Sequence, residues 1–300
     1  MKENDTNAEK AKSQESEGNT NRQKLPAGKI APKLMALDLD DTLLNNDLCI
    51  SDRTVEALKK AAAQKIYIAI CSGRSPSAIL PFVRRLDLAG TEQGRYAVAS
   101  NGSVVVDLHE RQEIYSAAVS GDVLVEAMKA ADRVGLPCQV YSSSMVYANV
   151  DNEYTRMDSK LTGVPSEIVP DFEKFLAKGF AKMMIPGDPK ILVGLQKELA
   201  ERFEGRAVAL ISKPYFLEIL PLNCGKGEAL EFLCGRLGIG MKEVMAFGDS
   251  MNDETMIVKC GMSVGMLNGL EEIKNEAAYV TRLTNDQDGI ADFVEQFVLI

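Results

Sequence analysis

Two short clusters of acidic residues stand where apolar runs of the sequence end. Asp38 and Asp40 close the run LMALDLD, and Asp249 closes the run VMAFGD. Residues i and i+2 of a strand point to the same side, and open α/β sheets bind ligands at the carboxyl ends of their strands. Carboxylates gathered there need a multivalent cation, and all-oxygen ligands select Mg²⁺ over zinc or copper. These clusters predict a magnesium site at a sheet edge.

Two further groups predict that this site binds phosphate. Ser72, Gly73 and Arg74 follow the run IYIAIC and offer a hydroxyl and a backbone N–H where a helix begins, which is a suitable seat for phosphate. Lys226 opens a later helix in the segment GKGEAL. Taken alone, Ser72 is equally well explained as a helix N-cap, Arg74 as a surface ion-pair partner and Lys226 as a solvated lysine. Their combination with the carboxylates favours phosphate chemistry.

Other phosphate-binding motifs do not fit this sequence. A P-loop needs glycine where Leu220 stands and Ser or Thr where Gly227 follows Lys226. A cysteine phosphatase needs its cysteine further from its arginine than Cys71 is from Arg74. The sequence also contains no GxGxxG segment, which weakens a dinucleotide-binding interpretation.

The elements that must position these residues follow an alternating pattern. Short apolar runs at 34–40, 66–72, 96–100, 244–249 and 262–266 are typical of buried parallel strands. Helical periods lie between them, the first of which is expected to begin at Ser51 or Asp52. The pattern predicts an α/β fold with a doubly wound parallel sheet, similar to a Rossmann fold.

The middle third of the chain has a different texture. Apolar runs alternate there with amphipathic helices near 121–134 and 189–203, which predicts an α+β segment. We therefore expect a core domain made of residues 30–114 and 220–300, with an inserted cap domain over 115–219. Residues 1–29 are almost entirely polar, and we expect them to form a disordered tail.

Composition limits the partners and the compartment. The chain of 300 residues has 34 Lys and Arg against 43 Asp and Glu, so its net charge of −9 argues against binding to nucleic acid or to membranes. It shows neither a spanning apolar run nor a secretory leader, which makes the cytoplasm the expected location. The six cysteines form no CxxC pair and are expected to be small buried apolar residues. His109 is the single histidine, which argues against catalytic triads that need histidine and against histidine-rich zinc sites.

The ordered set of motifs resembles the haloacid dehalogenase superfamily of phosphotransferases. The motifs are DLDDTLL, ICSGR, SNGS, GKGEAL, FGDSMND, VGMLNG and NDQDGIA, and the resemblance covers residues 33 to 297. It is closest to the Cof-type subgroup, whose large cap of the C2 type lies between the second and third motifs. Two positions depart from the subgroup. The pair Cys71-Ser72 stands where Ala-Thr or Thr-Thr is more common, and Asp41 stands where many members carry Gly.

The resemblance implies roles for the acidic residues and for one lysine. Asp38 would attack phosphorus and form an aspartyl phosphate, and Asp40 would protonate the leaving oxygen and later deprotonate the hydrolytic water. Mg²⁺ would be held by the carboxylates of Asp38 and Asp249 and by the backbone carbonyl of Asp40. Lys226 would balance the remaining negative charge.

The other candidate residues are expected to bind substrate or to support these groups. Ser72 and Gly73 would hold the phosphoryl group beside Arg74, while Asn252 and Asp253 would orient metal-bound water and the Lys226 ammonium. Asn101 and Gly102 either face the substrate or form an ordinary hairpin turn. In the cap, Lys182 is the first candidate for substrate specificity, followed by Arg156, Tyr141, Tyr147 and Tyr154.

The function predicted is a Mg²⁺-dependent phosphatase of small phosphorylated metabolites, such as sugar phosphates. Pyridoxal phosphate and flavin mononucleotide remain open as substrates. A phosphomutase that uses the same aspartyl phosphate and a phosphate sensor without enzymatic activity are the alternatives. A sensor has no need of Asp40, so the complete set of Asp38, Asp40, Lys226 and Asp249 argues against the last of these.

Overall fold

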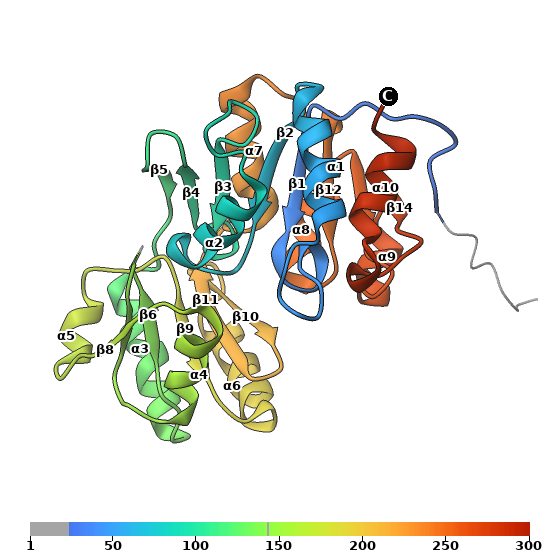
Figure 1. The fold of residues 1–300 in the computed structure, drawn as a ribbon. Helices are drawn as coiled ribbons and strands as arrows, with labels where there is room; N and C mark the ends of the chain where they lie inside the picture. Colours follow the sequence, from blue (N-terminus) through green and yellow to red (C-terminus); the bar gives the residue numbers. More distant parts are fainter. Residues whose placement is uncertain (1–23, 143) are drawn as a thin grey trace, which may run out of the picture.

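A computed structural model describes residues 24–142 and 144–300, which form two β-sheets with helices packed against them (Figure 1). The first sheet has the strand order β14 (Tyr279–Val280), β13 (Met262–Gly265), β12 (Val244–Gly248), β1 (Leu34–Asp38), β2 (Tyr67–Cys71), β3 (Tyr96–Ala99), β4 (Val104–Asp107) and β5 (Gln112–Ser116). The strands from β14 to β3 are parallel, and β4 and β5 extend the sheet as an antiparallel edge.

Strand β1 shows why this sheet is buried on both faces. All five of its side chains are buried, and the four apolar ones alternate between two apolar clusters. Met35 and Leu37 pack with helices α1 (Asp52–Ala63), α2 (Pro76–Leu86) and α10 (Gly289–Phe297). Leu34 and Ala36 pack with α7 (Lys226–Leu237) and α8 (Glu254–Lys259) on the other face. This is the doubly wound α/β architecture that the run pattern predicts.

Helix α1 begins at the residue expected from its sequence. Ser51 is the N-cap, and its hydroxyl oxygen accepts a hydrogen bond of 3.1 Å from the backbone N–H of Thr54. The cap satisfies one of the unpaired N–H groups at the start of the helix. Helix α1 therefore begins directly after the loop that carries the acidic cluster, and β2 returns beside β1.

The second sheet belongs to the middle of the chain. Its strand order is β10 (Ala207–Lys213), β11 (Phe216–Pro221), β9 (Met183–Pro186), β6 (Gln139–Tyr141), β7 (Val146–Ala148) and β8 (Ser166–Ile168). Helices α3 (Gly121–Arg133), α5 (Phe172–Leu176) and α6 (Pro189–Arg202) bury their apolar faces against this sheet, and α4 (Glu153–Thr162) lies beside it. The chain leaves the first sheet after β5 and returns to it after β11, so the second sheet is an insertion, as expected of a cap. The boundaries at 114/115 and 219/220 remain predictions.

Short elements complete the described chain. They are the turns Leu39–Leu43, Ser100–Gly102, Met241–Glu243, Met251–Asp253 and Asn285–Gln287, together with helix α9 (Glu271–Glu276). Three of these turns follow the strands β1, β3 and β12 and carry residues of the predicted site. Loops at strand ends are thus the segments that position the chemistry.

Lys24 and Pro26, near the beginning of the described residues, lie against the core domain. Residues 1–23 of the expected tail are outside the described residues. Lys24 contacts the sheet, because its carbonyl oxygen accepts a hydrogen bond of 2.8 Å from Val280 N–H and its ammonium donates one of 2.8 Å to the carbonyl oxygen of Asn275. Pro26 is buried. Residues 24–29 are thus ordered against the core domain.

Two further observations concern cysteines and membranes. All six cysteines are free, and Cys71, Cys138, Cys234 and Cys260 are buried, whereas Cys224 is half-buried and Cys49 is exposed. Within the described parts of the chain, no helix has both the length and the apolar character needed to cross a bilayer.

Candidate active site

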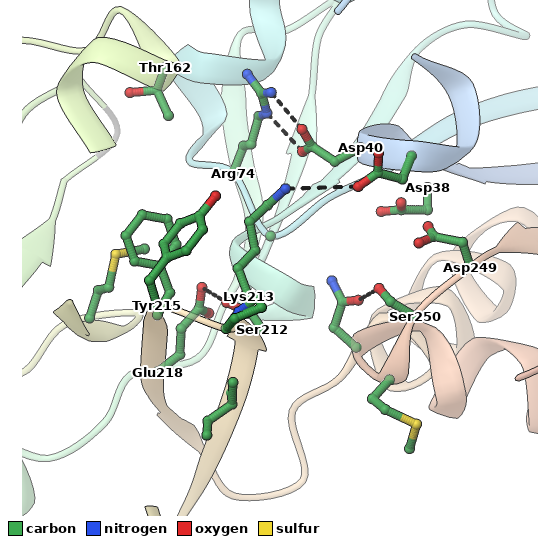
Figure 2. Close-up of a pocket in the computed structure, with 18 of the residues that line it drawn as sticks. Asp38, Asp40, Arg74, Thr162, Ser212, Lys213, Tyr215, Glu218, Asp249 and Ser250 are labelled. Carbon is green, nitrogen blue, oxygen red and sulfur yellow. Dashed lines mark hydrogen bonds and ion pairs between the residues drawn. The ribbon is translucent and has the colours of Figure 1, made fainter. Parts of the chain in front are cut away.

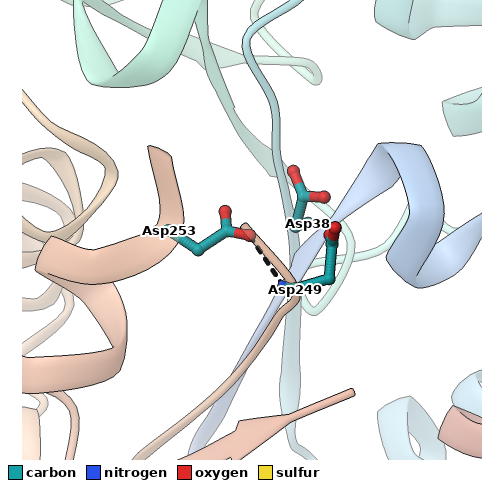
Figure 3. Close-up of side chains that lie close together, drawn as sticks. All are labelled: Asp38, Asp249 and Asp253. Carbon is teal, nitrogen blue, oxygen red and sulfur yellow. Dashed lines mark hydrogen bonds between the residues drawn. The ribbon is translucent and has the colours of Figure 1, made fainter. Parts of the chain in front are cut away.

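The two acidic clusters meet because β1 and β12 are neighbours in the sheet. Asp38 is the last residue of β1, and Asp249 directly follows β12. One carboxylate oxygen each of Asp38, Asp249 and Asp253 lies within 4.8 Å of the others (Figure 3). Asp38 is only 4% exposed and Asp249 only 8%. The structure therefore brings together three carboxylates in a nearly buried place.

A single buried cation lies among these carboxylates. Lys226, the first residue of α7, is fully buried, and its Nζ is 2.5 Å from an oxygen of Asp38 and 2.5 Å from an oxygen of Asp253. The second oxygen of Asp253 accepts hydrogen bonds from the backbone N–H groups of Asp249 and Ser250 at 2.9 and 3.2 Å. Asp253 therefore contacts both the lysine and the backbone of the loop after β12.

The negative charge at this point exceeds what Lys226 can balance. Burial and the charge of Asp253 raise the pKa of Asp38 well above its ordinary value, although Lys226 opposes them. Burial and Asp253 also raise the pKa of Asp249 to about 7, while the Thr42 hydroxyl, which donates a 2.7 Å hydrogen bond to Asp249, opposes the shift. A divalent cation bound to these oxygens would remove the repulsion. The donor set, carboxylates of Asp38 and Asp249 without nitrogen or sulfur, fits Mg²⁺.

Asp40 is not part of this group of three carboxylates and pairs with Arg74 instead. The guanidinium donates two hydrogen bonds, from Nε at 2.9 Å and from Nη2 at 2.6 Å, to the two carboxylate oxygens (Figure 2). Burial would raise the pKa of Asp40, but the hydrogen bonds and charge of Arg74 outweigh burial and lower it, with a smaller contribution from Lys213. The Asp40 carboxyl group is therefore ionised at neutral pH in this arrangement.

The loop after β2 lies beside Asp40. Ser72 is fully buried, and its hydroxyl accepts a 3.1 Å hydrogen bond from the backbone N–H of Arg74. A Cβ atom on Gly73 would lie 2.9 Å from the Asn101 side-chain oxygen, so glycine allows the two loops to approach each other. The loop geometry thus places a hydroxyl and backbone groups at the carboxyl end of the sheet.

The structure places the Asn101-Gly102 segment in a hairpin turn, and neither residue lines the cavity described below. It is the turn between the antiparallel strands β3 and β4, and it also contacts the start of α7. Gly102 has φ +93°, and a Cβ atom there would lie 2.0 Å from the carbonyl oxygen of Gly225. The Asn101 amide donates to Glu218 at 2.8 Å and accepts from Asn252 at 3.1 Å. Asn101 thus joins residues from three parts of the chain.

A cavity of about 550 Å³ lies between this sheet edge and the second sheet. Of the predicted site residues, those that line it are Asp38, Asp40, Gly73, Arg74, Lys182, Asp249 and Asn252. Those that are buried without lining it are Ser72, Asn101, Gly102, Lys226 and Asp253. Among the cap tyrosines considered, Tyr141 lines the cavity, whereas Tyr147 packs on Phe175 at 4.8 Å. Arg156 is exposed on α4, pairs with Asp151 just before that helix and does not line the cavity.

Sequence analysis overlooked three residues of this region. Thr42 holds Asp249, Lys213 reaches from the end of β10 to within 4.0 Å of Asp41, and Glu218 projects from β11 into the interface. Glu218 left a signal, because it is the single charged residue of the buried strand FLEILP. A charge that interrupts a buried strand needs partners, so its position pointed to a polar site.

This architecture defines a class of protein. Carboxylates at the end of the central parallel strand, with a second sheet inserted above them, are the arrangement of the haloacid dehalogenase-type phosphotransferases. The family model for haloacid dehalogenase-like hydrolases matches residues 35–294, so the chain belongs to that family, and it resembles the Cof-type members in its motifs and inserted cap. It is a phosphoric monoester hydrolase.

Relatives and solved structures agree with this assignment. The chain is 28% identical over 269 residues to the HMP-PP phosphatase of Serratia proteamaculans, covering 89% of this chain and 95% of the relative. It is 29% identical over 273 residues to a 5-amino-6-(5-phospho-D-ribitylamino)uracil phosphatase of Bacillus subtilis, covering 89% and 96%. A haloacid dehalogenase-like hydrolase from Bacteroides thetaiotaomicron superposes with a TM-score of 0.80 at 31% identity, covering 88% of this chain and 98% of that one.

Proposed function

We propose that the protein is a Mg²⁺-dependent phosphatase that hydrolyses small phosphorylated metabolites through an aspartyl phosphate on Asp38. The observation that carries the proposal is the position of Asp38. It lies at the end of the central strand, is bound by Lys226 at 2.5 Å and still lines the cavity. A buried carboxylate that faces a ligand cavity beside a fixed cation is suited to attack on phosphorus.

Lys226 alone cannot offset the repulsion between the Asp38 carboxylate and a substrate phosphate. A carboxylate that approaches a phosphate dianion to about 4 Å meets roughly 8 kcal/mol of repulsion at an effective dielectric constant near 20. One ammonium group, shared with Asp253, offsets only part of this. Mg²⁺ held by Asp38, Asp249 and the backbone carbonyl of Asp40 would neutralise charge on the phosphoryl group when bound.

The reaction divides between Asp38 and Asp40. A carboxylate oxygen of Asp38 bonds to phosphorus while the bond to the leaving oxygen breaks, and Asp40 donates a proton to that oxygen. Water then attacks phosphorus and gives its proton to Asp40. The bond between phosphorus and the Asp38 oxygen breaks, and phosphate is released. Ser72, Gly73 and Lys226 would hold the phosphoryl oxygens, while Asn252 and Asp253 keep the loop after β12 in place.

The wall of the cavity supports a substrate whose leaving group carries a flat ring. Tyr141, Met184 and Phe216 line its cap side, and Tyr215 stands edge-on to Phe216 at 4.6 Å between ring centres. The cap carboxylate in the wall, Glu218, is already bonded to Lys182 and Asn101, so it has little capacity left for sugar hydroxyl groups. One relative is named for a phosphate of a uracil derivative, which agrees with this interpretation.

The compartment we propose is the cytoplasm. None of the six cysteines is in a disulfide, which agrees with a reducing environment.

A phosphate-release screen tests the proposed function. The panel contains p-nitrophenyl phosphate, pyridoxal 5′-phosphate, flavin mononucleotide and glucose 6-phosphate, each with Mg²⁺ and with excess chelator. We expect Mg²⁺-dependent release, with kcat/KM at least tenfold higher for the ring-bearing metabolites than for glucose 6-phosphate. Full activity in chelator would contradict the metal requirement. A preference for glucose 6-phosphate would contradict the proposed selectivity for a leaving group with a flat ring.

A pair of variants tests the wall itself. Tyr215→Leu removes the aromatic face, whereas Tyr215→Phe keeps the ring and loses only the hydroxyl. We expect the first to lower kcat/KM for pyridoxal 5′-phosphate about tenfold and the second to lower it by less than threefold. Equal losses in the two variants would assign the effect to the hydroxyl instead.

A further inference from the structure

The cap contains a buried ion pair that faces the core domain. Lys182, just before β9, and Glu218, in β11, are each 3% exposed, and their charged atoms are 3.2 Å apart. The Ser212 hydroxyl donates to the same Glu218 oxygen at 2.9 Å, and the Lys182 ammonium lies 4.6 Å from the centre of the Tyr141 ring. The two charges therefore neutralise each other within the cap.

Each member of the pair also makes one hydrogen bond across the domain interface. The Lys182 ammonium donates to the carbonyl oxygen of Gly73 at 2.9 Å. The second oxygen of Glu218 accepts from the Asn101 amide at 2.8 Å, and Figure 2 shows Glu218 beside Ser212 among the residues that line the cavity. The pair is thus bonded to the loop after β2 and to the loop after β3.

The network continues from Asn101 to the third loop of the site. Asn101 accepts a 3.1 Å hydrogen bond from the Asn252 amide, and the Asn252 oxygen accepts one of 2.6 Å from the Ser250 hydroxyl. The backbone N–H of Asn101 also donates to the Ser72 carbonyl oxygen at 3.0 Å. A single ion pair in the cap therefore connects to three of the core loops around the predicted phosphate and metal positions, those after β2, β3 and β12.

This connection is more than stability requires. A buried ion pair loses hydration on folding, and apolar replacements of similar volume often leave stability unchanged or increase it. Two of the three N–H donors of the Lys182 ammonium are engaged, one by a carbonyl oxygen of the core domain and one by the Glu218 carboxylate. Its geometry is suited to fixing the Gly73 loop.

We propose that Lys182 and Glu218 are positioning residues for phosphoryl transfer. They fix the Gly73 and Asn101 loops directly and the Asn252 loop through Asn101, so that the docked cap sets the geometry of the site. The proposal rests on the phosphatase function above for its activity readout, but its second readout does not.

The decisive variant removes both charges together. Lys182→Met with Glu218→Leu leaves neither charge unpaired, so the protein should fold with a melting temperature close to that of the wild type. We expect kcat for p-nitrophenyl phosphate to fall at least tenfold with KM changed by less than threefold. The single variant Lys182→Met leaves the Glu218 carboxylate buried without its cation and should be less stable than the double variant.

Amide hydrogen exchange gives the readout that is independent of activity. In the double variant, peptides that contain 72–74 and 100–102 in the core should exchange at least fivefold faster, although both substitutions lie in the cap. The control replaces the exposed cap pair Lys129 and Glu173, whose charged atoms are 2.8 Å apart, in the same way. Lys129→Met with Glu173→Leu should change neither kcat nor exchange in these peptides.

Each outcome bears on the proposal. A double variant with wild-type kcat and wild-type exchange would overturn it, because the pair would then have only a structural role. If the wild type releases no phosphate but the double variant still shows faster exchange in these peptides, the proposed function is contradicted and the positioning of the loops is supported. If the double variant does not fold, Asn101→Gly removes the amide that joins Glu218 to Asn252 without strain at φ 53°. In that variant, wild-type kcat would overturn the proposal and a loss of at least fivefold would support it.

Discussion

Arg74 binds both carboxylate oxygens of Asp40, the residue expected to act as general acid and base. The paired geometry keeps this carboxyl group ionised at neutral pH, because it lowers the pKa of Asp40 in spite of burial. A residue that must give up a proton is thus held in its basic form before substrate binds. The negative charge of a bound phosphate would raise the pKa of Asp40 and favour uptake of the proton.

The first prediction concerns this ion pair. Arg74→Met should raise the pKa of Asp40 towards its ordinary value, since two hydrogen bonds and a positive charge are lost. Because the folded-state pKa is depressed, the pair stabilises the fold above pH about 3.9, and this contribution is lost as pH falls through the folded-state value. Carboxyl carbon chemical shifts measured by NMR across pH report the pKa directly. Arg85→Met, on the helix α2 that follows the Arg74 loop, is the control and should leave the pKa of Asp40 unchanged.

The second prediction concerns the intermediate. Asp40→Asn removes the base that activates water, whereas p-nitrophenolate departs without needing a proton from Asp40. We expect phosphorylated protein to accumulate, with a burst of about one equivalent of nitrophenolate and a later rate reduced about 10² to 10⁴-fold. Mass spectrometry should locate the phosphate on the peptide that contains Asp38. Rapid steady turnover without a trapped phosphoprotein would contradict the role of Asp40, and Asp38→Asn should show neither burst nor turnover.

The third prediction concerns the buried lysine. Lys226→Met leaves the carboxylates of Asp38 and Asp253 without their cation and should cost about 3–5 kcal/mol of unfolding free energy. Adding Asp253→Asn removes one unpaired charge, so the double variant should recover part of the stability but none of the activity. Urea unfolding and phosphate release measure the two effects. The exposed Lys190→Met serves as control, and a fully stable Lys226→Met would contradict a stabilising role of the buried lysine.

The fourth prediction concerns the turn between β3 and β4. Gly102→Ala places a Cβ atom 2.0 Å from the carbonyl oxygen of Gly225 at φ +93°, so the turn must move away from the start of α7. We expect a clear fall in melting temperature and in activity. Gly135→Ala is matched, because Gly135 has φ +70° but open space around the added methyl group. It should cost only about 1 kcal/mol, since backbone strain is its one penalty. Equal effects of the two substitutions would mean that contact with Gly225 is unimportant.

The fifth prediction concerns metal binding without catalysis. Mg²⁺ that binds only the folded state should stabilise it by about 2.7 kcal/mol at a concentration 100 times its dissociation constant. Thermal unfolding with MgCl₂, compared with NaCl at equal ionic strength, should show this increase. Asp249→Asn removes one of the proposed ligands and should abolish most of it. An unchanged melting temperature in wild type at millimolar Mg²⁺ would argue against the site.

Much of the site could be read from local sequence because strand ends determine it. Once 34–40 and 244–249 are recognised as buried parallel strands, Asp38 and Asp249 must reach the same edge of the sheet. Spacing within each run also placed Asp40, Ser72 and Lys226 at the junctions where they occur. These inferences need only the periodicity of apolar residues and the direction of parallel strands.

The contacts between distant segments were decided by the tertiary structure alone. Glu218 meets Asn101 across 117 positions of sequence, and Lys182 meets Gly73 across 109. No local pattern specifies either contact, because both depend on how the inserted sheet docks on the core domain. The sequence by itself determined which groups could do chemistry and at which strand ends they lie. The docking of the cap decided which of its charges face the core loops, since a buried charge settles only where hydrogen-bonding partners are present.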